Sequence, residues 1–427
     1  MLERRPDSRF PSLVERFVSY VKMDTQSAED SDTYPSTPGQ LEMGRVLVKE
    51  LQDLGLSDAA MDEYGYVTAT LPANDPALES VPAVGFIAHM DTYPEVSGKD
   101  VQPVFHENYA GGDIALPKNG VVIQAAENPY LQECVGETII TADGTTLLGA
   151  DDKAGVAEIM EALTRLVENP DFKHGTIKVA FTPDEEVGAG VKYFDIEKFG
   201  ATVAYTMDGG RRGEVENETF CADSAIVTFV GRDIHPGYAK DKMVPAIKVA
   251  ATFIESLPRD MAPETTEGKQ GYVHPISIEG NTSKVTVHLL IRDFALDQLP
   301  VKAQLLRELA QQACAAWPGS SFEFEIKEYY RNMKYDLEKE PRAVDYALEA
   351  IRRVGLEPVL GSIRGGTDGA NLTARGLPTP NLFTGEQSFH SYTEWVCVKD
   401  MELAVDTILN LIQVWAEKEG ATGQASA

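Results

Sequence analysis

Apolar residues in the first half of the chain recur at two different spacings. A spacing of three to four residues, typical of helices with one buried face, covers residues 12–21, 40–54 and 153–166. Short unbroken apolar runs, typical of buried strands, cover residues 83–88, 176–181 and 202–207. Because strands alternate with helices, this part of the chain is predicted to form an α/β domain with a mostly parallel sheet.

The order of elements changes after residue 215. The sequence predicts a strand at 225–230, a helix at 244–256, strands at 271–278 and 284–292, a helix at 301–316 and a strand at 322–329. This β-α-β-β-α-β order is that of a ferredoxin-like α+β sandwich, which we expect to be inserted at 216–330. Residues 1–215 and 331–427 then form the larger domain together. Their last part is predicted to hold helices at 343–354 and 401–417 and a glycine-rich turn at 365–369.

Length and charge narrow the class of protein. A chain of 427 residues is too long for one ordinary core and suits one large domain with one smaller domain. Its net charge of −29 argues against a nucleic-acid partner, because phosphate binding requires clustered lysine and arginine. Acidic residues are therefore plentiful, and a single Asp or Glu says little about function by itself.

Targeting signals and cysteines indicate where the protein is found. The segment Met1–Asp7 carries charges with no apolar stretch behind them, so we expect no signal peptide. No run of about 18 apolar residues occurs, so no membrane helix is predicted. The four cysteines are scattered without a Cys-x-x-Cys pair: Cys134, Cys221, Cys314 and Cys397. This pattern favours free thiols in a reducing compartment, and we expect a cytoplasmic protein without a membrane partner.

Polar residues that suit chemistry follow the predicted strands of the larger domain. Open α/β sheets place their sites at the carboxyl ends of strands. Four such strand ends or nearby loops carry acids or histidine, at residues 89–91, 149–153, 184–186 and 208–210, and His390 lies in a loop before the last helix. Each of these features alone is typical of a structural role, such as a helix cap or a solvated turn. Together they predict several acids and two histidines in one cleft.

Two imidazoles and three carboxylates in one cleft form a donor set that suits zinc, with manganese or cobalt as substitutes. If Asp151 bridges two ions, one ion has His89, Asp151 and Asp208 as ligands. The other ion has Asp151, Glu186 and His390. Each ion then has three protein ligands and an open position, which a hydrolytic site requires.

Two further acids have no ligand role in this arrangement. Asp91, two residues after His89, is placed to orient the imidazole through its other ring nitrogen. Glu185, next to Glu186, is placed to take a proton from the attacking water and pass it to the leaving amine.

The motifs in this order resemble those of the peptidase T family of metallo-aminopeptidases, which belongs with glutamate carboxypeptidase, dipeptidases and aminoacylases in one metallo-exopeptidase superfamily. The matching segments are residues 89–92, 107–109, 111–113, 141–155 (TADGTTLLGADDKAG), 182–186, 205–210, 235–240 and 363–370 (IRGGTDGA). The resemblance covers nearly the whole chain. It implies the five ligands above, two Zn²⁺ per subunit, catalytic roles for Asp91 and Glu185, and release of the N-terminal residue from tripeptides.

The resemblance also implies residues that hold the substrate or the tetrahedral intermediate, namely His235, Asn281, Arg292 and Arg364. Arginine suits a peptide carboxylate because it donates two parallel hydrogen bonds, and histidine can donate to a developing oxyanion. In this interpretation residues 216–330 form a lid through which two subunits can dimerise. The expected partners are short peptides.

Two alternatives remain open at this point. Another exopeptidase or amidohydrolase of the superfamily, such as a dipeptidase, a carboxypeptidase or an aminoacylase, would use the same site. A non-catalytic peptide-binding relative would differ in class, and it would normally lack a ligand or the general base. An N-acetylated peptide distinguishes an aminopeptidase from the other enzymes of the superfamily, because an aminopeptidase should reject it. Bound metal distinguishes all of these enzymes from the non-catalytic relative.

Overall fold

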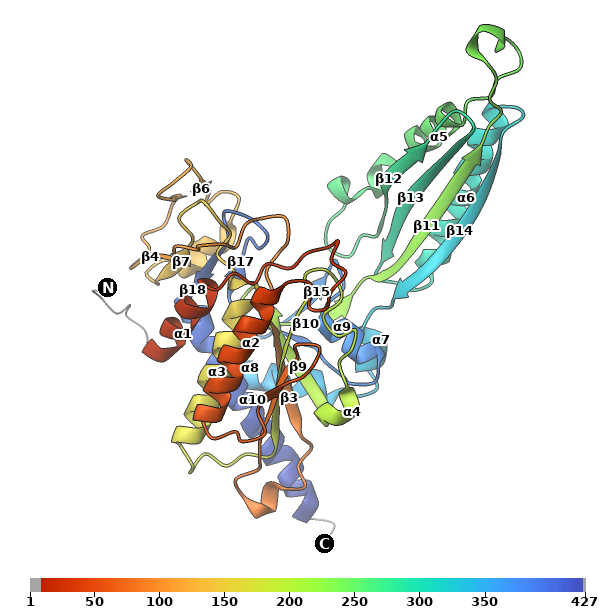
Figure 1. Ribbon diagram of the computed structural model, residues 1–427. Coiled ribbons are helices and arrows are strands. Elements are labelled where there is room, and N and C mark those ends of the chain that lie inside the picture. The colour runs from red at the N-terminus through yellow and green to blue at the C-terminus, as the bar shows by residue number, and fades with distance from the viewer. Residues whose placement is uncertain (1–8, 425–427) are drawn as a thin grey trace. The chain divides into compact units, whose positions relative to one another are not determined.

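The computed structural model describes residues 9–424, and the chain divides into two compact units (Figure 1). The first unit contains the chain up to Asn217, Tyr335–Gly361 and the chain from Thr367 onward. The second contains Glu218–Lys334 and Ser362–Gly366. The sequence placed this insertion at 216–330. The segment Met1–Asp7, on which the expected lack of a signal peptide rests, lies outside the described residues.

A mixed eight-stranded sheet forms the centre of the first unit. Its strands, in spatial order, are β1 (Ala60–Met61), β2 (Val67–Leu71), β8 (Ile177–Thr182), β3 (Val84–His89), β9 (Val203–Gly209), β16 (Asn381–Phe383), β10 (Glu214–Thr219) and β15 (Val359–Ile363). The pairs β8–β3, β3–β9 and β9–β16 are parallel, whereas β2–β8 and β10–β16 are antiparallel. The predicted mostly parallel sheet is therefore confirmed at its centre, where the carboxyl ends of β3, β8 and β9 lie side by side.

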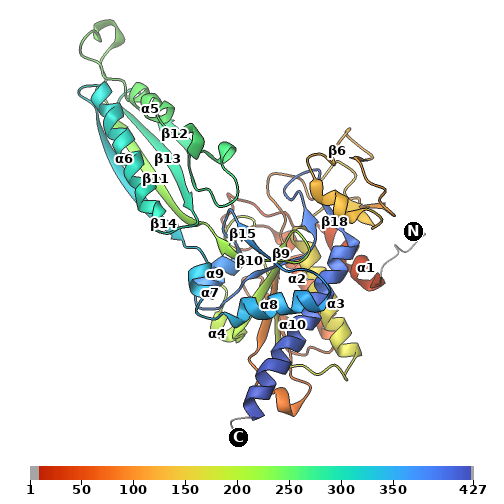
Figure 2. The same cartoon turned by 180° about the vertical axis from the view of Figure 1, so that it is seen from behind.

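Helices cover both faces of this sheet (Figures 1 and 2). The helices of the first unit are α1 (Pro11–Val21), α2 (Pro38–Asp53), α3 (Ala150–Glu168), α4 (Ile196–Phe199), α7 (Lys334–Leu337), α8 (Arg342–Arg353), α9 (Asp368–Ala374) and α10 (Val398–Gln424). On β3, Phe86 and Ala88 pack into the core that holds α1, α2, α3, α8 and α10, whereas Ile87 packs on the opposite side with residues of α4 and α9. This alternation follows from the two-residue period of a strand. It explains why β3 reads as a continuous apolar run, since both of its faces are buried.

Two small sheets lie outside the central sheet and combine residues 104–141, between β3 and α3, with residues 386–397, before α10. The sequence predicted no elements in these two regions. One contains β17 (Glu386–Gln387), β18 (Trp395–Cys397), β7 (Ile139–Thr141) and β4 (Val104–His106), and the other pairs β5 (Ile114–Ala115) with β6 (Val122–Ile123). They enclose a separate core around Trp395. Strands of two or three residues are too short to give a recognisable alternation.

The second unit is a four-stranded antiparallel sheet with two helices. Its sheet order is β12 (Tyr272–Gly280), β13 (Lys284–Asp293), β11 (Cys221–Val230) and β14 (Ser321–Tyr330). Helices α5 (Ala246–Glu255) and α6 (Gln298–Ala316) share one core with the alternate residues of β11 and β13. This order and connectivity confirm the predicted ferredoxin-like sandwich.

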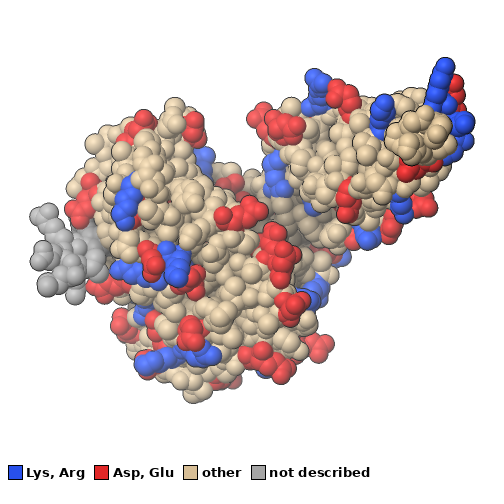
Figure 3. All heavy atoms as spheres, turned by 45° about the horizontal axis from the view of Figure 1, so that its top comes forward, with Lys and Arg blue, Asp and Glu red and all other residues tan. Residues whose placement is uncertain are grey.

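The glycine-rich turn predicted at 365–369 is shorter than expected. Helix α9 already begins at Asp368, because the side chain of Thr367 accepts the backbone N–H of Ala370 and caps the first turn. Among the helices of residues 9–424, none has the length and apolar character that a membrane span requires. Acidic and basic side chains are interspersed over the face in Figure 3. All four cysteines are free.

Candidate metal centre

His89 ends the central strand β3, and its imidazole points at two carboxylates from neighbouring segments. Nε2 lies 2.9 Å from Oδ1 of Asp151 and 3.7 Å from Oδ1 of Asp208. Nδ1 lies 3.2 Å from the backbone oxygen of Asp91 and 3.4 Å from its Oδ1. The strand is buried throughout, so His89 is fixed by the core beneath it.

His390 completes a second group on the other side of Asp151. Its Nε2 lies 3.1 Å from Oδ2 of Asp151 and 2.8 Å from Oε2 of Glu186. The imidazole stacks on the ring of Tyr93, with 4.1 Å between ring centroids. The two oxygens of Asp151 therefore face different histidines. The five residues predicted as ligands lie together in the two groups that the sequence suggested.

Asp151 is held from its backbone side by a residue that the sequence did not single out. Glu394 accepts N–H groups from Leu148, Gly149 and Asp151, at 2.8, 2.9 and 3.0 Å. Asp151 has φ of −78° and ψ of 106°, so it stands in an extended conformation before the regular part of α3. Glu394 thus fixes the loop that presents Asp151.

The side chain of Asp91 binds the backbone of Glu185 and Glu186. Oδ1 of Asp91 accepts the N–H of Glu185 at 3.0 Å, and Oδ2 accepts the N–H of Glu186 at 3.1 Å. Asp91 is fully buried. It therefore fixes the loop of both glutamates in addition to lying beside the His89 ring.

The acidic loop is also tied to helix α2. Asp184 has φ of 57°, and its carboxylate accepts hydrogen bonds from the backbone N–H and the hydroxyl of Ser36 and from the side chain of Gln40. The backbone N–H of Asp184 donates to the side-chain oxygen of Gln40 at 2.9 Å. The first acid of the predicted triplet thus has a structural role, which leaves Glu185 and Glu186 to face the site.

The two histidines and the neighbouring carboxylates shift one another's pKa values. Burial alone would raise the pKa of Asp151, but hydrogen bonds with His390 and His89 outweigh it and hold this pKa below its ordinary value. Burial raises the pKa of Glu186 to about 8, assisted by the charge of Asp151. For His390, burial acts in the opposite direction, and its bonds to Asp151 and Glu186 raise its pKa to about 10.

The donor set fits divalent cations. Imidazole nitrogens and carboxylate oxygens are the ligands that zinc, manganese and cobalt share. Oε1 of Glu186 is buried and has no hydrogen-bond partner among the described residues. Ligand atoms of His89, Asp151 and Glu186 all lie within 4.8 Å of one another. A cation would satisfy these atoms and remove the repulsion between the acids.

Other buried acids surround the centre, and sequence reasoning missed their roles. Oδ2 of Asp152 accepts the N–H of His89 at 2.9 Å, and Oδ2 of Asp368 accepts the hydroxyl of Thr182 at 2.8 Å. Burial raises the pKa of Asp368 to about 7. Glu386 lies near Asp151 and Asp208. The adjacency of Asp152 to Asp151 and the position of Asp368 in the glycine-rich turn were the available signals.

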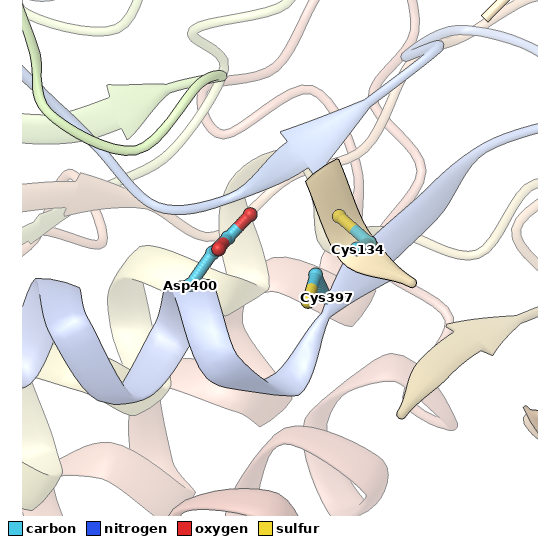
Figure 4. Close-up of side chains that lie close together, drawn as sticks. All are labelled: Cys134, Cys397 and Asp400. Atoms are coloured by element: carbon cyan, nitrogen blue, oxygen red, sulfur yellow. The ribbon is translucent and has the colours of Figure 1, made fainter. Parts of the chain in front are cut away.

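A second group of residues with metal-ligand chemistry is present at Cys134, Cys397 and Asp400 (Figure 4). Asp400 pairs with Arg212 at 3.2 Å and accepts the hydroxyl of Tyr130 at 2.7 Å. A hydrogen bond with Cys134 and burial both raise the pKa of the Cys397 thiol, which favours the neutral form. Because Arg212 already offsets the charge of Asp400, we interpret this group as part of the core.

The four residues expected to hold substrate all belong to the second unit. Asn281 closes the turn between β12 and β13, where its side-chain oxygen accepts N–H groups of Ser283 and Lys284. Arg292 donates to the backbone oxygens of Asp223 and Ile291.

Arg364 and His235 are the other two residues expected to hold substrate. Arg364 donates to the backbone oxygens of Gly268 and Gln270. His235 is exposed, and its Nδ1 accepts the N–H of Gly237 at 3.1 Å. The binding of substrate by all four residues stays a prediction.

Comparison with known proteins gives the family. Residues 142–414 match peptidase family M20/M25/M40. The chain is 47% identical to peptidase T of Clostridium acetobutylicum over 95% of this chain and 99% of that protein. It is 46% identical to peptidase T of Listeria monocytogenes over 95% of this chain and 99% of that protein.

Solved structures agree with this assignment. Aminopeptidase PepT from Bacillus cereus is 25% identical, with a TM-score of 0.73 over 96% of this chain and 99% of that one. A tripeptidase from Staphylococcus aureus has the same fold, with a TM-score of 0.74 at 21% identity over 96% of this chain and 100% of that one. The chain therefore belongs to peptidase family M20/M25/M40, among the relatives of peptidase T.

Proposed function

We propose that this peptidase is a metal-dependent aminopeptidase that releases the N-terminal residue from tripeptides. The observation that carries the proposal is the division of the Asp151 carboxylate between two histidines, with Oδ1 facing His89 and Oδ2 facing His390. One carboxylate shared in this way between two imidazole-carboxylate groups suits a pair of cations. The names of the curated relatives, peptidase T, support the choice of reaction.

The proposed cofactor is two Zn²⁺ ions per subunit, with Mn²⁺ or Co²⁺ able to replace them. His89, Asp151 and Asp208 would hold one ion, and Asp151, Glu186 and His390 would hold the other. A structural relative from Bacillus subtilis, with a TM-score of 0.60 at 14% identity, is described as a dinuclear metal-binding peptidase of this family. When bound, the ions would supply Lewis acidity to the scissile carbonyl and lower the pKa of water.

Glu185 is the residue that we propose to move the proton. Its loop is fixed because Asp91 accepts its N–H at 3.0 Å. Burial raises the pKa of Glu185 well above its ordinary value, and neighbouring cations would oppose that shift. A carboxyl group whose pKa lies near the working pH can take a proton from water and then give it to the leaving amine.

The second unit would supply the substrate contacts. We propose Arg292 and Arg364 for the peptide carboxylate and His235 and Asn281 for the tetrahedral intermediate. We also retain the prediction that two subunits associate through this unit. The imidazole of His235 is exposed and contacts only its neighbours Gly237 and Tyr238, so its replacement should leave folding intact.

A peptide series tests the reaction. A free tripeptide should yield its first residue and a dipeptide, and the N-acetylated tripeptide should be resistant. A chelator should abolish the reaction, and added Zn²⁺ should restore it. Cleavage of the acetylated peptide would identify an aminoacylase instead, cleavage of dipeptides alone would identify a dipeptidase, and hydrolysis that survives complete metal removal would contradict the proposal.

A further inference from the structure

Glu386 is a buried carboxylate beside the metal centre that the five proposed ligands do not include. It is 1% exposed, and its Oε2 has no hydrogen-bond partner among residues 9–424. One ligand oxygen each from Glu386, Asp151 and Asp208 lie within 4.8 Å of one another. A buried carboxylate oxygen without a hydrogen-bond partner is costly, so the position of Glu386 requires a physical reason.

The backbone fixes Glu386 next to the loop that follows Asp208. The N–H of Thr384 donates to the backbone oxygen of Gly209 at 2.6 Å, and the N–H of Gly385 donates to that of Gly210 at 2.9 Å. Gly385 has φ of 94°, and a Cβ at this position would lie 2.5 Å from Cβ of Asp400. The chain therefore makes a turn that only glycine fits and continues into β17, which begins with Glu386.

We propose that Glu386 is a sixth protein ligand of the metal centre and gives an oxygen to the cation shared by Asp151 and Asp208. This inference rests on the metal-dependent function proposed above. Three carboxylates at such distances repel one another in a buried site, and a divalent cation between them converts that repulsion into attraction. The free Oε2 of Glu386 is the atom that would bind.

A sixth ligand would change the metal preference of this position. Its donors would be three carboxylates and the imidazole of His89, and carboxylate-rich sites favour harder ions such as Mn²⁺. Four protein ligands complete the tetrahedral shell that zinc usually adopts. An ion of higher coordination number would keep a position open for water. The ion at Asp208 should therefore be bound with a stronger relative preference for Mn²⁺ than the ion at His390.

A neutral Glu386 without a ligand role is the competing explanation. Glutamine has the shape of a protonated glutamate and lacks the anionic oxygen. Glu386→Gln therefore separates the two explanations, since it should be harmless to binding if the residue is merely a neutral core group. Glu158→Gln is a matched control because Glu158 is also fully buried and neither of its carboxylate oxygens has a hydrogen-bond partner among the described residues. Glu158 belongs to none of the candidate ligand groups found among those residues.

The experiment is a calorimetric titration of metal-free full-length protein with Mn²⁺ and, separately, with Zn²⁺. The wild-type protein should bind two ions. Glu386→Gln should weaken Mn²⁺ binding at one position about 10–100-fold, with a smaller loss for Zn²⁺ and no change at the other position. Glu158→Gln should match the wild type for both ions.

Three results would decide against parts of this scheme. Unchanged Mn²⁺ and Zn²⁺ affinities in a folded Glu386→Gln variant would overturn the role of Glu386 and leave the two-metal function standing. A wild-type protein that binds neither ion would overturn the proposed function itself. If Glu386→Gln does not fold, Glu386→Asp takes its place: weaker Mn²⁺ binding by the shortened carboxylate supports the ligand role, and unchanged binding overturns it.

Discussion

Glu394 holds Asp151 through the backbone: Oε1 of Glu394 accepts the N–H of Asp151 at 3.0 Å. The other oxygen accepts two more N–H groups from the same loop. The carboxylate of Asp151 is consequently left free to face the two histidines. The position of this shared carboxylate thus depends on Glu394, which is not among the proposed ligands.

Replacement of Glu394 by glutamine should therefore loosen the loop of Asp151. Glutamine would turn donor hydrogens toward backbone N–H groups, and a buried donor left without an acceptor costs about 1–3 kcal/mol. We expect a lower midpoint of thermal unfolding and weaker binding of both ions. Calorimetric metal titration of Glu394→Gln checks this, and full affinity for both ions would show that the loop holds Asp151 without Glu394.

Asp151→Asn should empty the metal centre, because one carboxylate serves both groups. Glu186→Gln should remove one ion only, since its oxygen faces His390 at 2.8 Å and belongs to one side. Elemental analysis of dialysed protein gives the number of ions per chain. Equal losses in the two variants would contradict a shared ligand.

Glu185→Gln should lose turnover and keep its metal. General acid–base groups contribute about 10²–10⁴-fold to rate, so a fall of that size in kcat is expected. The loop should stay in place because Asp91 binds the backbone N–H of residue 185 and not its side chain. Steady-state kinetics with metal analysis on the same sample test this, and near-normal turnover in a metal-loaded variant would remove Glu185 from the mechanism.

Glu158 should make stability depend on pH. Burial raises its pKa well above the ordinary value of 4.5, so the folded chain binds this proton more tightly than the unfolded chain does. The stabilisation that this bound proton adds to the free energy of unfolding is complete below pH 4.5. It is lost as the pH rises toward the pKa of Glu158 in the folded chain. Glutamine has no proton to lose, so the free energy of unfolding of Glu158→Gln should not fall in this way. Relative to the wild type it should rise by up to about 1.4 kcal/mol per pH unit between pH 4.5 and the folded pKa.

Thermal unfolding of the wild type and Glu158→Gln at a series of pH values above 4.5 measures this difference. The exposed Glu323→Gln controls for the loss of one negative charge. A difference between wild type and Glu158→Gln that does not change with pH would contradict the prediction.

The larger elements and the positions of the proposed ligands were predictable because they depend on local patterns. Continuous apolar runs such as 84–88 identify buried strands, and parallel strands bring their carboxyl ends to one edge. His89 and Asp208 follow directly from that rule. The ferredoxin-like order of the second unit was equally readable, because a long strand such as β13 alternates between buried and less buried positions over ten residues.

The supporting residues were not predictable, because their partners lie far away in the sequence. Glu394 acts on a backbone N–H 243 residues earlier, and Asp184 acts on Ser36 148 residues earlier. No local spacing encodes such contacts. The short strands around Trp395 were missed for a different reason: two or three residues carry no periodicity.

The distance along the chain between Asp151 and its C-terminal partners has a consequence for biosynthesis. His390 lies 239 residues after Asp151, and Glu394 lies 243 residues after it. Domains fold as they leave the ribosome, N-terminal parts first. A nascent chain that has already formed β3 and α3 still lacks one imidazole and the anchor of the shared carboxylate. The proposed ion-binding centre therefore cannot be complete before His390 and Glu394 have left the ribosome.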